Sequence, residues 1–294
     1  EVRRRLEEIS IDGILDANYI AELTRDHAFS LFETTGSSER PDVIASKLLE
    51  GRVALIVDGT PVVLTVPYLF CENFQSDEDY YQSFWVSSVG RLLRYVSFFL
   101  TVSVPALYLA LLTHHTRLLP TFLLLSAAQS RAGVPFSSLP ECLALIVILE
   151  LLGETGARMP QQLGHTLSIV GGLVVGQAAV EARLVSAPML IVVALSGIAG
   201  LMVPRLRGAV LYARVGMVLL AAVLGLPGCF LGLTVIAVRL MGLSSYGVPY
   251  LSPLEHPDLQ GLKDTAWRLP WRFMRTRPAF SRNSVRQRGG KRRE

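Results

Sequence analysis

The residues that could do chemistry in this sequence are polar side chains placed inside apolar segments. Glu150 and Gln177 each interrupt an apolar run. A charge or amide at membrane depth is costly unless it faces protein or water, so such groups mark candidate ion pathways. Glu181 and Arg183 are further polar groups near this depth, and the alternative for them is a simple aqueous turn. We therefore expect Glu150 and Gln177 to be the functional polar residues of the apolar region.

A pair of glycines four residues apart could bring two helices into close contact. Gly172 and Gly176 have the small-xxx-small spacing that lets helix backbones approach in a membrane, where lipid offers no hydrophobic drive for association. Ordinary helix packing is the simpler interpretation of this pair, and a functional role is the alternative.

Catalytic motifs are absent from the sequence. It contains no H-E-x-x-H, no G-x-S-x-G, no phosphate-binding G-x-x-x-x-G-K-[ST] and no G-x-G-x-x-G. The three cysteines, Cys71, Cys142 and Cys229, are widely separated and lack C-x-x-C spacing, which indicates buried inert thiols. We expect no enzyme activity, no cofactor and no metal site.

The composition places these residues in a membrane protein. Hydrophobic residues make up 51% of the 294 residues and charged residues only 18%, against about 25% charged residues in soluble domains. The mean hydropathy is +0.42. The chain opens on Glu-Val-Arg-Arg-Arg with neither an initiator Met nor a secretory leader, which suggests a truncated front end.

The first apolar run, residues 95–112, is long enough to span a bilayer with its flanks counted. Arg91 and Arg94 directly precede it, and we expect them to anchor the span at the cytoplasmic surface, the alternative being a solvated helix face. Further apolar regions lie at residues 118–128, 139–152, 163–180, 184–203 and 209–243.

These regions predict an all-α polytopic bundle of four to six spans. The run 118–128 is too short to cross, whereas 184–203 is a clean span that ends before Arg205 and Arg207. The long run 209–243 could form a helical hairpin broken at Gly225-Leu-Pro-Gly. An even number of crossings would return the basic tail to the side of the N-terminal region.

The N-terminal region, residues 1–78, reads as a water-facing α/β subdomain. We expect a short strand at 8–12 and a helix at 41–50 that closes at Gly51. The Asp58-Gly59 turn between residues 53–57 and 62–66 is a strong hairpin signal.

An amphipathic linking helix at 79–94 should continue into the first span, which gives a bundle at 95–243. Ser76-Asp77-Glu78-Asp79 fits a capping box that would open this helix. The remaining residues, 244–294, form a basic tail with a disordered end. We expect its aromatic and basic residues to lie on anionic lipid headgroups, with nucleic acid as the alternative; they are Trp267, Arg268, Trp271, Arg272, Phe273, Arg275 and Arg277.

An ordered set of short strings resembles the GerA family of bacterial spore germination proteins. The strings lie at residues 38–42, 49–61, 79–81, 91–95, 170–181 and 244–253, and the resemblance extends to about Pro278. Gln82 departs from the pattern, because an arginine is common there. The motif residues carried over are Glu39, Arg40, Pro41, Asp42, Glu50, Gly51, Arg52, Asp58, Gly59, Thr60, Pro61, Gly247, Pro249 and Tyr250.

The resemblance implies a function in nutrient-triggered germination. It implies that the chain belongs to the A subunit of a germinant receptor, or to its relative encoded with the dipicolinic-acid transport proteins. The resemblance also implies that this subunit forms a five-fold homo-oligomeric cation channel. The channel would sit in the spore inner membrane with its soluble domain and tail in the cytoplasm. It would act with a permease-like B subunit that binds the germinant and a lipoprotein C subunit. A secondary transporter, for which broken helices are also expected, and a non-conducting scaffold are the competing hypotheses.

Overall fold

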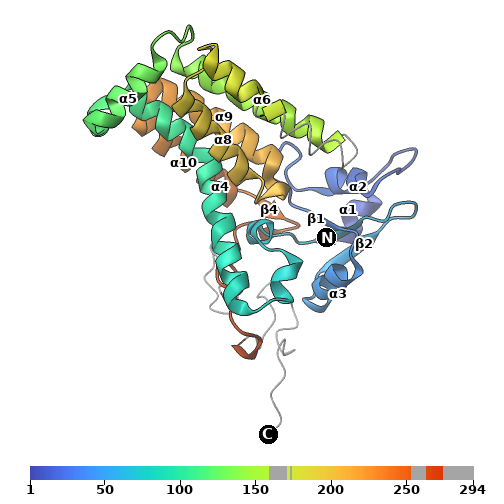
Figure 1. The fold of residues 1–294 in the computed structure, drawn as a ribbon. Coiled ribbons are helices and arrows are strands. Elements are labelled where there is room, and N and C mark those ends of the chain that lie inside the picture. The colour runs from blue at the N-terminus through green and yellow to red at the C-terminus, as the bar shows by residue number, and fades with distance from the viewer. Residues whose placement is uncertain (159–170, 173, 253–262, 274–294) are drawn as a thin grey trace. The chain divides into compact units, whose positions relative to one another are not determined.

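The structure, a computed structural model, describes residues 1–158, 171–172, 174–252 and 263–273. The chain divides into two compact units. The first, here called the terminal unit, combines residues 1–95 with residues 237–294, and the second, the helical unit, is Val96–Ile236. The chain passes between them inside helix α4 (Phe84–Thr113) and again inside helix α10 (Leu226–Met241). Most described residues are helical and the strands are few and short (Figure 1).

The terminal unit contains a three-stranded antiparallel sheet of order β1-β3-β2. Its strands are β1 (Gly36–Ser38), β2 (Val53–Ile56) and β3 (Val63–Val66). The predicted hairpin is confirmed, with Val53 opposite Val66 and Gly59 at φ +86° in the turn. A glycine suits this backbone because it has no Cβ to clash at positive φ.

Two predicted features of the N-terminal region have different outcomes. Helix α3 (Pro41–Leu49) is confirmed, with Pro41 in its first turn and Gly51 at φ +91° beyond its end, and it lies beside β2 in Figure 1. The strand predicted at 8–12 is wrong, because those residues are irregular between α1 (Val2–Glu7) and α2 (Ala17–Thr24). Ile9 instead packs against the core that α2 forms with β3.

The link into the first span also differs from the prediction. The capping box at Ser76 is present, but it caps a single turn of 3₁₀ helix, η2 (Asp77–Tyr80), which follows η1 (Phe70–Phe74). The chain then turns at residues 81–83, so the helix predicted to run on from Asp79 begins only at Phe84. The Ser87 hydroxyl and the Arg268 guanidinium donate to the Asp79 carbonyl, which occupies an acceptor that a continuing helix would use.

The C-terminal part of the terminal unit is a small hairpin followed by an irregular segment. Strands β4 (Ser244–Ser245) and β5 (Val248–Pro249) pair antiparallel around Tyr246 and Gly247, which both have positive φ. A 3₁₀ turn, η5 (Trp271–Phe273), ends the described chain.

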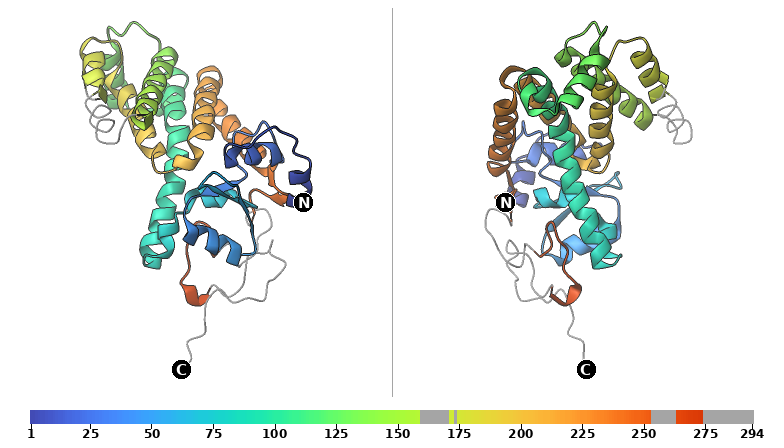
Figure 2. Two further views of the ribbon diagram at one scale, coloured as in Figure 1. Left: turned by 90° about the vertical axis from the view of Figure 1, so that its right-hand side faces the viewer. Right: turned by 60° about the vertical axis from the view of Figure 1, so that its left-hand side comes forward.

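In the helical unit, α6 packs against α8 and α9, and α5 packs against α8 (Figure 1, Figure 2). The chain also forms one-turn 3₁₀ helices before α5 and α9, and residues 174–181 are helical. The bounds are η3 (Thr116–Leu118), α5 (Thr121–Arg131), α6 (Ser138–Arg158), α8 (Ala187–Gly200), η4 (Pro204–Leu206) and α9 (Arg207–Leu224).

Two helices among the described residues are long and apolar enough to cross a membrane. They are the 30-residue α4 and the 21-residue stretch Pro204–Leu224. The predicted break in the run 209–243 is confirmed, because α9 and α10 meet at Gly225. Half of the predicted run at 163–180, residues 163–170 and 173, lies outside the described residues, and the number of crossings stays a prediction.

The clean span predicted at 184–203 is shorter than expected. Helix α8 has 14 residues, or about 21 Å at about 1.5 Å per residue, against about 30 Å of hydrocarbon. Its start is set by Ser186, whose backbone amide and hydroxyl both donate to the buried carboxylate of Glu141. Pro204 lies at the start of the next helical turn.

Candidate functional site

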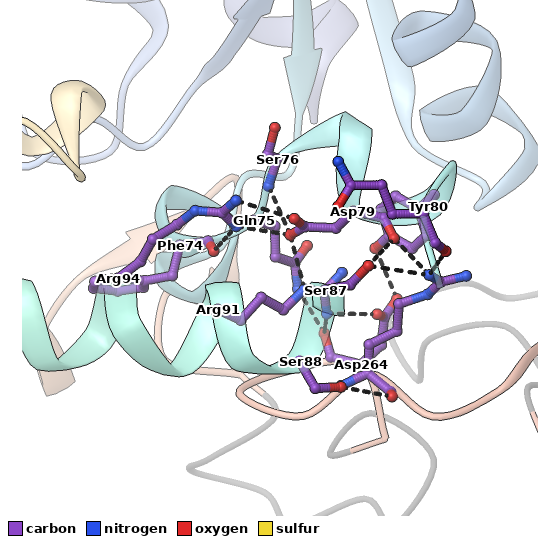
Figure 3. A network of polar contacts seen from close by, with 12 residues as sticks. Phe74, Gln75, Ser76, Asp79, Tyr80, Ser87, Ser88, Arg91, Arg94 and Asp264 are labelled. Atoms are coloured by element: carbon purple, nitrogen blue, oxygen red, sulfur yellow. Dashed lines mark hydrogen bonds and ion pairs between the residues drawn. The ribbon is translucent and has the colours of Figure 1, made fainter. Parts of the chain in front are cut away.

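The most extensive polar network of the described residues lies where α4 begins (Figure 3). Three arginines, two aspartates and a tyrosine contact one another there, mostly with little access to solvent. They come from η2, from the first three turns of α4 and from the segment 263–268 after the last long helix. We call this set the arginine cluster; its members are Asp79, Tyr80, Arg91, Arg94, Asp264 and Arg268.

Asp79 is the acceptor at one side of the cluster. Arg94 donates to both carboxylate oxygens, at 2.7 and 3.0 Å, and Arg91 Nε donates to Oδ2 at 3.1 Å. The Ser76 amide donates to the same Oδ2 through the capping box. Burial alone would raise the pKa of Asp79, but these hydrogen bonds hold it below its usual range. Asp79 is therefore ionised at neutral pH.

Arg91 connects η2 to a segment 173 residues further along the chain. Its side chain is 0% exposed, and Nη1 donates to Asp264 Oδ1 at 2.8 Å. The Tyr80 hydroxyl donates to the other Asp264 oxygen at 2.9 Å, and the Arg91 guanidinium lies over the Tyr80 ring at 5.2 Å. Burial and the Asp264 carboxylate raise the pKa of Tyr80 well above its usual value, so it remains a neutral donor.

Arg268 adds a third guanidinium and fixes the main chain of the same segment. Its Nη1 donates to the carbonyls of Asp79 and Gln82. The Ser88 hydroxyl donates to the Arg268 carbonyl at 3.0 Å, and the Tyr80 ring also faces this guanidinium. Burial and the nearby Arg91 charge lower the pKa of Arg268. The cluster has the contacts of a structural clamp that holds residues 264–268 against the start of α4.

A second buried ion network contains two of the family-motif residues. Arg52 donates to Glu50 at 3.0 Å and to Glu72 at 2.6 Å, and Glu72 also pairs with Lys47. Burial would raise the pKa of Glu72, but Arg52 and Lys47 outweigh it and lower the pKa. Glu72 additionally accepts from the Leu69 amide. These contacts join α3 and β2 to the 3₁₀ turn that precedes the arginine cluster.

Other motif residues shape turns and surfaces of the terminal unit. Arg40 pairs with Asp42 at 2.7 Å, and Asp42 accepts from the Tyr81 hydroxyl at 2.7 Å. Glu39 is exposed. The remaining residues of these two strings are Pro41, in the first turn of α3, and Gly51, Asp58, Gly59, Thr60 and Pro61, which follow α3 or form the β2–β3 turn.

The motif at 247–250 brings the C-terminal hairpin onto the N-terminal region. Tyr250 is fully buried, accepts from Asn73 at its hydroxyl, and accepts from the Phe70 amide at its carbonyl. The Gly247 amide donates to Asp26 at 3.3 Å, while Pro249 lies in β5. Strings from the two ends of the sequence thus meet in one folded unit, whereas the string at 170–181 belongs to the helical unit.

The polar residues predicted for the apolar region are not brought together. Glu150 on α6 pairs with Arg214 of α9 at 2.6 Å and with Arg207 at 3.4 Å. Gln177 and Glu181 are both exposed on the helical stretch 174–181.

The glycine pair behaves unequally. A Cβ on Gly176 would touch Leu190 at 3.5 Å, whereas one on Gly172 would meet nothing within 4 Å. Only Gly176 therefore packs closely against another described helix.

Two arginines that were predicted to lie at the surface are buried. Arg91 was expected to anchor the first span at the cytoplasmic surface and Arg268 to lie on lipid headgroups, but both side chains are buried in the arginine cluster. Their depth relative to a membrane stays a prediction. Asp264 was missed altogether, because its partners lie more than 170 residues away and leave no local signal. The one local signal in the sequence was that Arg91 and Arg94 follow the acidic capping box residue Asp79 by 12 and 15 residues.

The prediction that the three cysteines are buried thiols is confirmed. Cys71, Cys142 and Cys229 are buried and free. Burial raises the pKa of Cys71 to about 12, which keeps it a thiol. Within the described ranges, no group of three or more His, Cys, Asp and Glu side chains could hold a metal ion.

Similarity to known proteins extends along nearly the whole chain. The profile of the family described as "Bacillus/Clostridium GerA spore germination protein" matches residues 1–280. The chain is 45% identical over 293 residues to Spore germination protein KA of Bacillus subtilis (strain 168), which covers 99% of this chain and 54% of that protein. It is 40% identical over 292 residues to Spore germination protein B1 of the same organism, covering 98% and 60%.

A third relative is named Uncharacterized membrane protein YfkQ of Bacillus subtilis (strain 168). The two sequences are 40% identical over 294 residues, and the alignment covers 99% of this chain and 57% of that protein. The chain thus spans little more than half the length of these relatives. No solved structure matches it. The extent and level of these similarities establish that the chain belongs to the Bacillus/Clostridium GerA family of spore germination proteins.

Proposed function

We propose that this chain is part of the membrane subunit of a nutrient germinant receptor, and that the subunit is a ligand-gated cation channel. The observation that carries the proposal is family membership over residues 1–280, with relatives named for spore germination. In this proposal the channel is a five-fold homo-oligomer in the spore inner membrane. The soluble part and the C-terminal tail face the cytoplasm, and four to six segments cross the bilayer.

The proposed partners follow from the family resemblance. A permease-like B subunit binds the germinant, a lipoprotein C subunit completes the receptor, and lipid surrounds the apolar helices. No nucleic acid takes part. The names of the relatives describe germination and membrane proteins, which supports a role other than catalysis.

Helix α4 is the proposed coupling element. Its first turns are held by the arginine cluster, and the same 30-residue helix continues into the apolar span. A continuous helix can transmit a movement between two discrete arrangements, whereas a flexible loop absorbs it. Displacing the terminal unit on germinant binding would thereby move the helix that enters the bundle.

The Glu150–Arg214 pair is the proposed polar element of the bundle. Arg214 is 2% exposed and its Nε atom has no hydrogen-bond partner among the described residues. Breaking or re-forming this pair would change the charge presented between α6 and α9. Gln177 and Glu181 remain candidates for the same pathway.

Cation flux tests the proposal. The protein expressed from its complete gene, reconstituted in liposomes loaded with a K⁺-sensitive dye, should show passive flux that saturates weakly with concentration. Saturable flux that depends on a second solute would instead indicate a carrier, a possibility that the break between α9 and α10 at Gly225 favours. Absence of flux from correctly inserted protein, with or without its partner subunits, would reduce the chain to a scaffold.

Helix continuity can be tested separately. Replacing Leu92 and Leu93 by glycine costs about 1 kcal/mol per residue in helix propensity relative to alanine, and should uncouple germinant-triggered cation release in spores. The matched control replaces both by alanine, which removes the same side chains but keeps the helix. Glycines at Gln82 and Ser83, in the turn before α4, should also leave the response intact. Equal responses from the glycine and alanine variants would refute the coupling role.

A further inference from the structure

The first three turns of α4 have two faces of opposite character. The face toward the arginine cluster carries Ser87, Ser88 and Arg91, all buried. The opposite face carries only large apolar side chains, and every one of them is substantially exposed. They are Trp85, Val86, Val89, Leu92 and Leu93.

This exposed apolar face continues into the proposed span. Val96, Phe99, Leu100 and Leu107 follow at helical spacing on the same exposed side. No Asp, Glu, Lys or Arg interrupts the stripe between residues 85 and 107, since Arg91 and Arg94 point into the cluster. Charge therefore does not mark the boundary between water and lipid on this side of the helix.

We propose that the lipid-contacting surface of α4 begins at Trp85, about three turns before the apolar run that follows the arginines, and that Trp267 shares this surface. The proposal rests on the membrane location in the proposed function. Its occupant is the headgroup and upper acyl region of the bilayer, and the arginine cluster lies behind it at that depth.

The length of the helix agrees with this placement. Thirty residues at about 1.5 Å each give about 45 Å, and a bilayer with its headgroup regions is about 40–45 Å thick. The helix from Phe84 to Thr113 therefore matches the whole bilayer, whereas the 18 residues at 95–112 match only the hydrocarbon core. Both ends of α4 then lie at headgroup level.

The aromatic residues favour lipid over a second protein copy as the occupant. Trp85 is 62% exposed and its ring meets that of Trp267, which is 42% exposed, edge-on at 6.3 Å. Trp is enriched where a membrane meets water because its ring is apolar and its N–H can reach the headgroups. Trp267 is fixed there by its neighbour Arg268, so the clamp positions an aromatic residue from the far end of the chain beside α4.

A location at headgroup depth would explain why each charged side chain of the cluster has at least one polar partner. Arg91 and Asp79 sit directly behind the apolar stripe on a helix that is only about 10 Å across. Near lipid, a charge that lacked a partner would be costly, and all charged members of the cluster have one within the terminal unit.

Depth-dependent quenching of single tryptophans tests the placement. These 294 residues contain three tryptophans, and any tryptophan elsewhere in the full-length protein is also replaced by phenylalanine. Trp267→Phe with Trp271→Phe then leaves Trp85 as the only tryptophan, and Trp85→Phe with Trp271→Phe leaves Trp267. Each variant of the full-length protein is reconstituted in phosphatidylcholine vesicles containing lipids brominated at shallow or deep acyl positions. Both tryptophans should be quenched at least twofold more strongly by the shallow bromines than by iodide in the water phase.

Two reference positions in a tryptophan-free background calibrate the result. Phe29→Trp lies on an exposed loop of the terminal unit and should be quenched only by iodide. Ile191→Trp, on the exposed side of α8, should be quenched only by bromines. These references separate failure of this inference from failure of the membrane assignment.

Three outcomes would overturn the inference. Iodide quenching of Trp85 while Ile191→Trp responds to bromines would place the start of α4 in water, with the membrane assignment intact. Protection of Trp85 from both quenchers would mean that protein, such as a second copy, covers the stripe. Iodide quenching of both positions would remove the membrane location on which the inference rests. Quenching is measured without ion flux, so a non-conducting protein gives an equally clear answer.

Discussion

Arg91 has to be matched by its surroundings because no solvent reaches it. Removing a guanidinium from water is expensive, and the cost is offset only where good geometry satisfies the charge. Asp79 and Asp264 approach from two segments, and the Tyr80 ring covers one face of the guanidinium. Arg91 therefore joins two segments, around Asp79 and Asp264, that lie far apart in the sequence.

Replacing Arg91 by Met should be strongly destabilising. The apolar side chain fills similar space but leaves Asp79 and Asp264 buried with one guanidinium fewer, a loss of about 3–5 kcal/mol in the free energy of unfolding. Urea unfolding in detergent, followed by tryptophan fluorescence, measures it. Arg3→Met is the matched control, because its pair with Glu7 is exposed and such pairs contribute about 0–1 kcal/mol. A loss below 1 kcal/mol in both variants would show that the cluster is dispensable for stability.

The clamp should be sensitive to acid through Asp79. The pKa of Asp79 in the folded chain lies below its usual range, so its hydrogen bonds contribute fully above the unfolded pKa of about 3.9. They are lost as the pH falls through the lower, folded pKa. The protection factor of the Ser76 amide, which donates to Asp79, should therefore fall steeply only below about pH 4. In Asp79→Asn this amide should exchange fast already at pH 7, and a flat profile in the wild-type chain would contradict the assignment.

At the scale of elements, local sequence patterns correctly predicted the turns and helix ends that depend only on residues close in sequence. The Asp58-Gly59 turn, the α3 boundaries and the break at Gly225 each depend on residues within a few positions, and each was found as predicted. The continuation of a helix through residues 81–83 was wrong, since the Asp79 carbonyl is occupied by Arg268 from another segment. Long-range partners of this kind leave no trace in periodicity, which is why the arginine cluster was not foreseen.

The α9–α10 connection should tolerate no side chain at its glycine. Gly225 has φ +67°, and a Cβ there would lie 2.7 Å from His115 Cε1 and 2.9 Å from His114 Cβ. Gly225→Ala should lower stability by about 1–3 kcal/mol through backbone strain alone, plus the clash. Gly208→Ala in α9 meets nothing within 4 Å and should stabilise by about 0.5–1 kcal/mol. Thermal unfolding in detergent compares the two variants. Equal unfolding midpoints would show that the backbone at Gly225 does not exclude a side chain.

The contact between α6 and α9 should depend on the carboxylate more than on the outer arginine. Glu150→Gln leaves the buried Arg214 without its counter-charge, and we expect a loss of about 3 kcal/mol. Arg207→Gln removes only a longer, partly exposed pair, with an expected loss of about 0–1 kcal/mol. Urea unfolding of the two variants would contradict this order if Arg207→Gln were the more damaging change.

At the scale of the whole molecule, the terminal unit is assembled from both ends of the chain. Residues 1–95 fold with residues beyond 237, and the long segment between them forms a second unit. The Phe70 amide donates to Tyr250, and the Tyr68 amide to the Ser245 hydroxyl. The N-terminal region therefore reaches its full set of contacts only after the helical segments have been made.

This arrangement predicts that the N-terminal region is incomplete without the segment after α10. In a chain ending at Leu243, the amides of Tyr68 and Phe70 lose their acceptors, and the cluster loses Asp264 and Arg268. Hydrogen exchange at these two amides should accelerate by at least tenfold, while exchange in β2 and β3, which pair with each other, should change far less. A chain ending at Phe273 keeps every described contact and should match the full-length protein. Adding a synthetic peptide of residues 244–273 to the shorter chain should restore the protection, because the contacts need proximity but no covalent link. Unchanged exchange in the chain ending at Leu243 would mean that residues 1–95 fold on their own, and the clamp would then hold only the C-terminal segment.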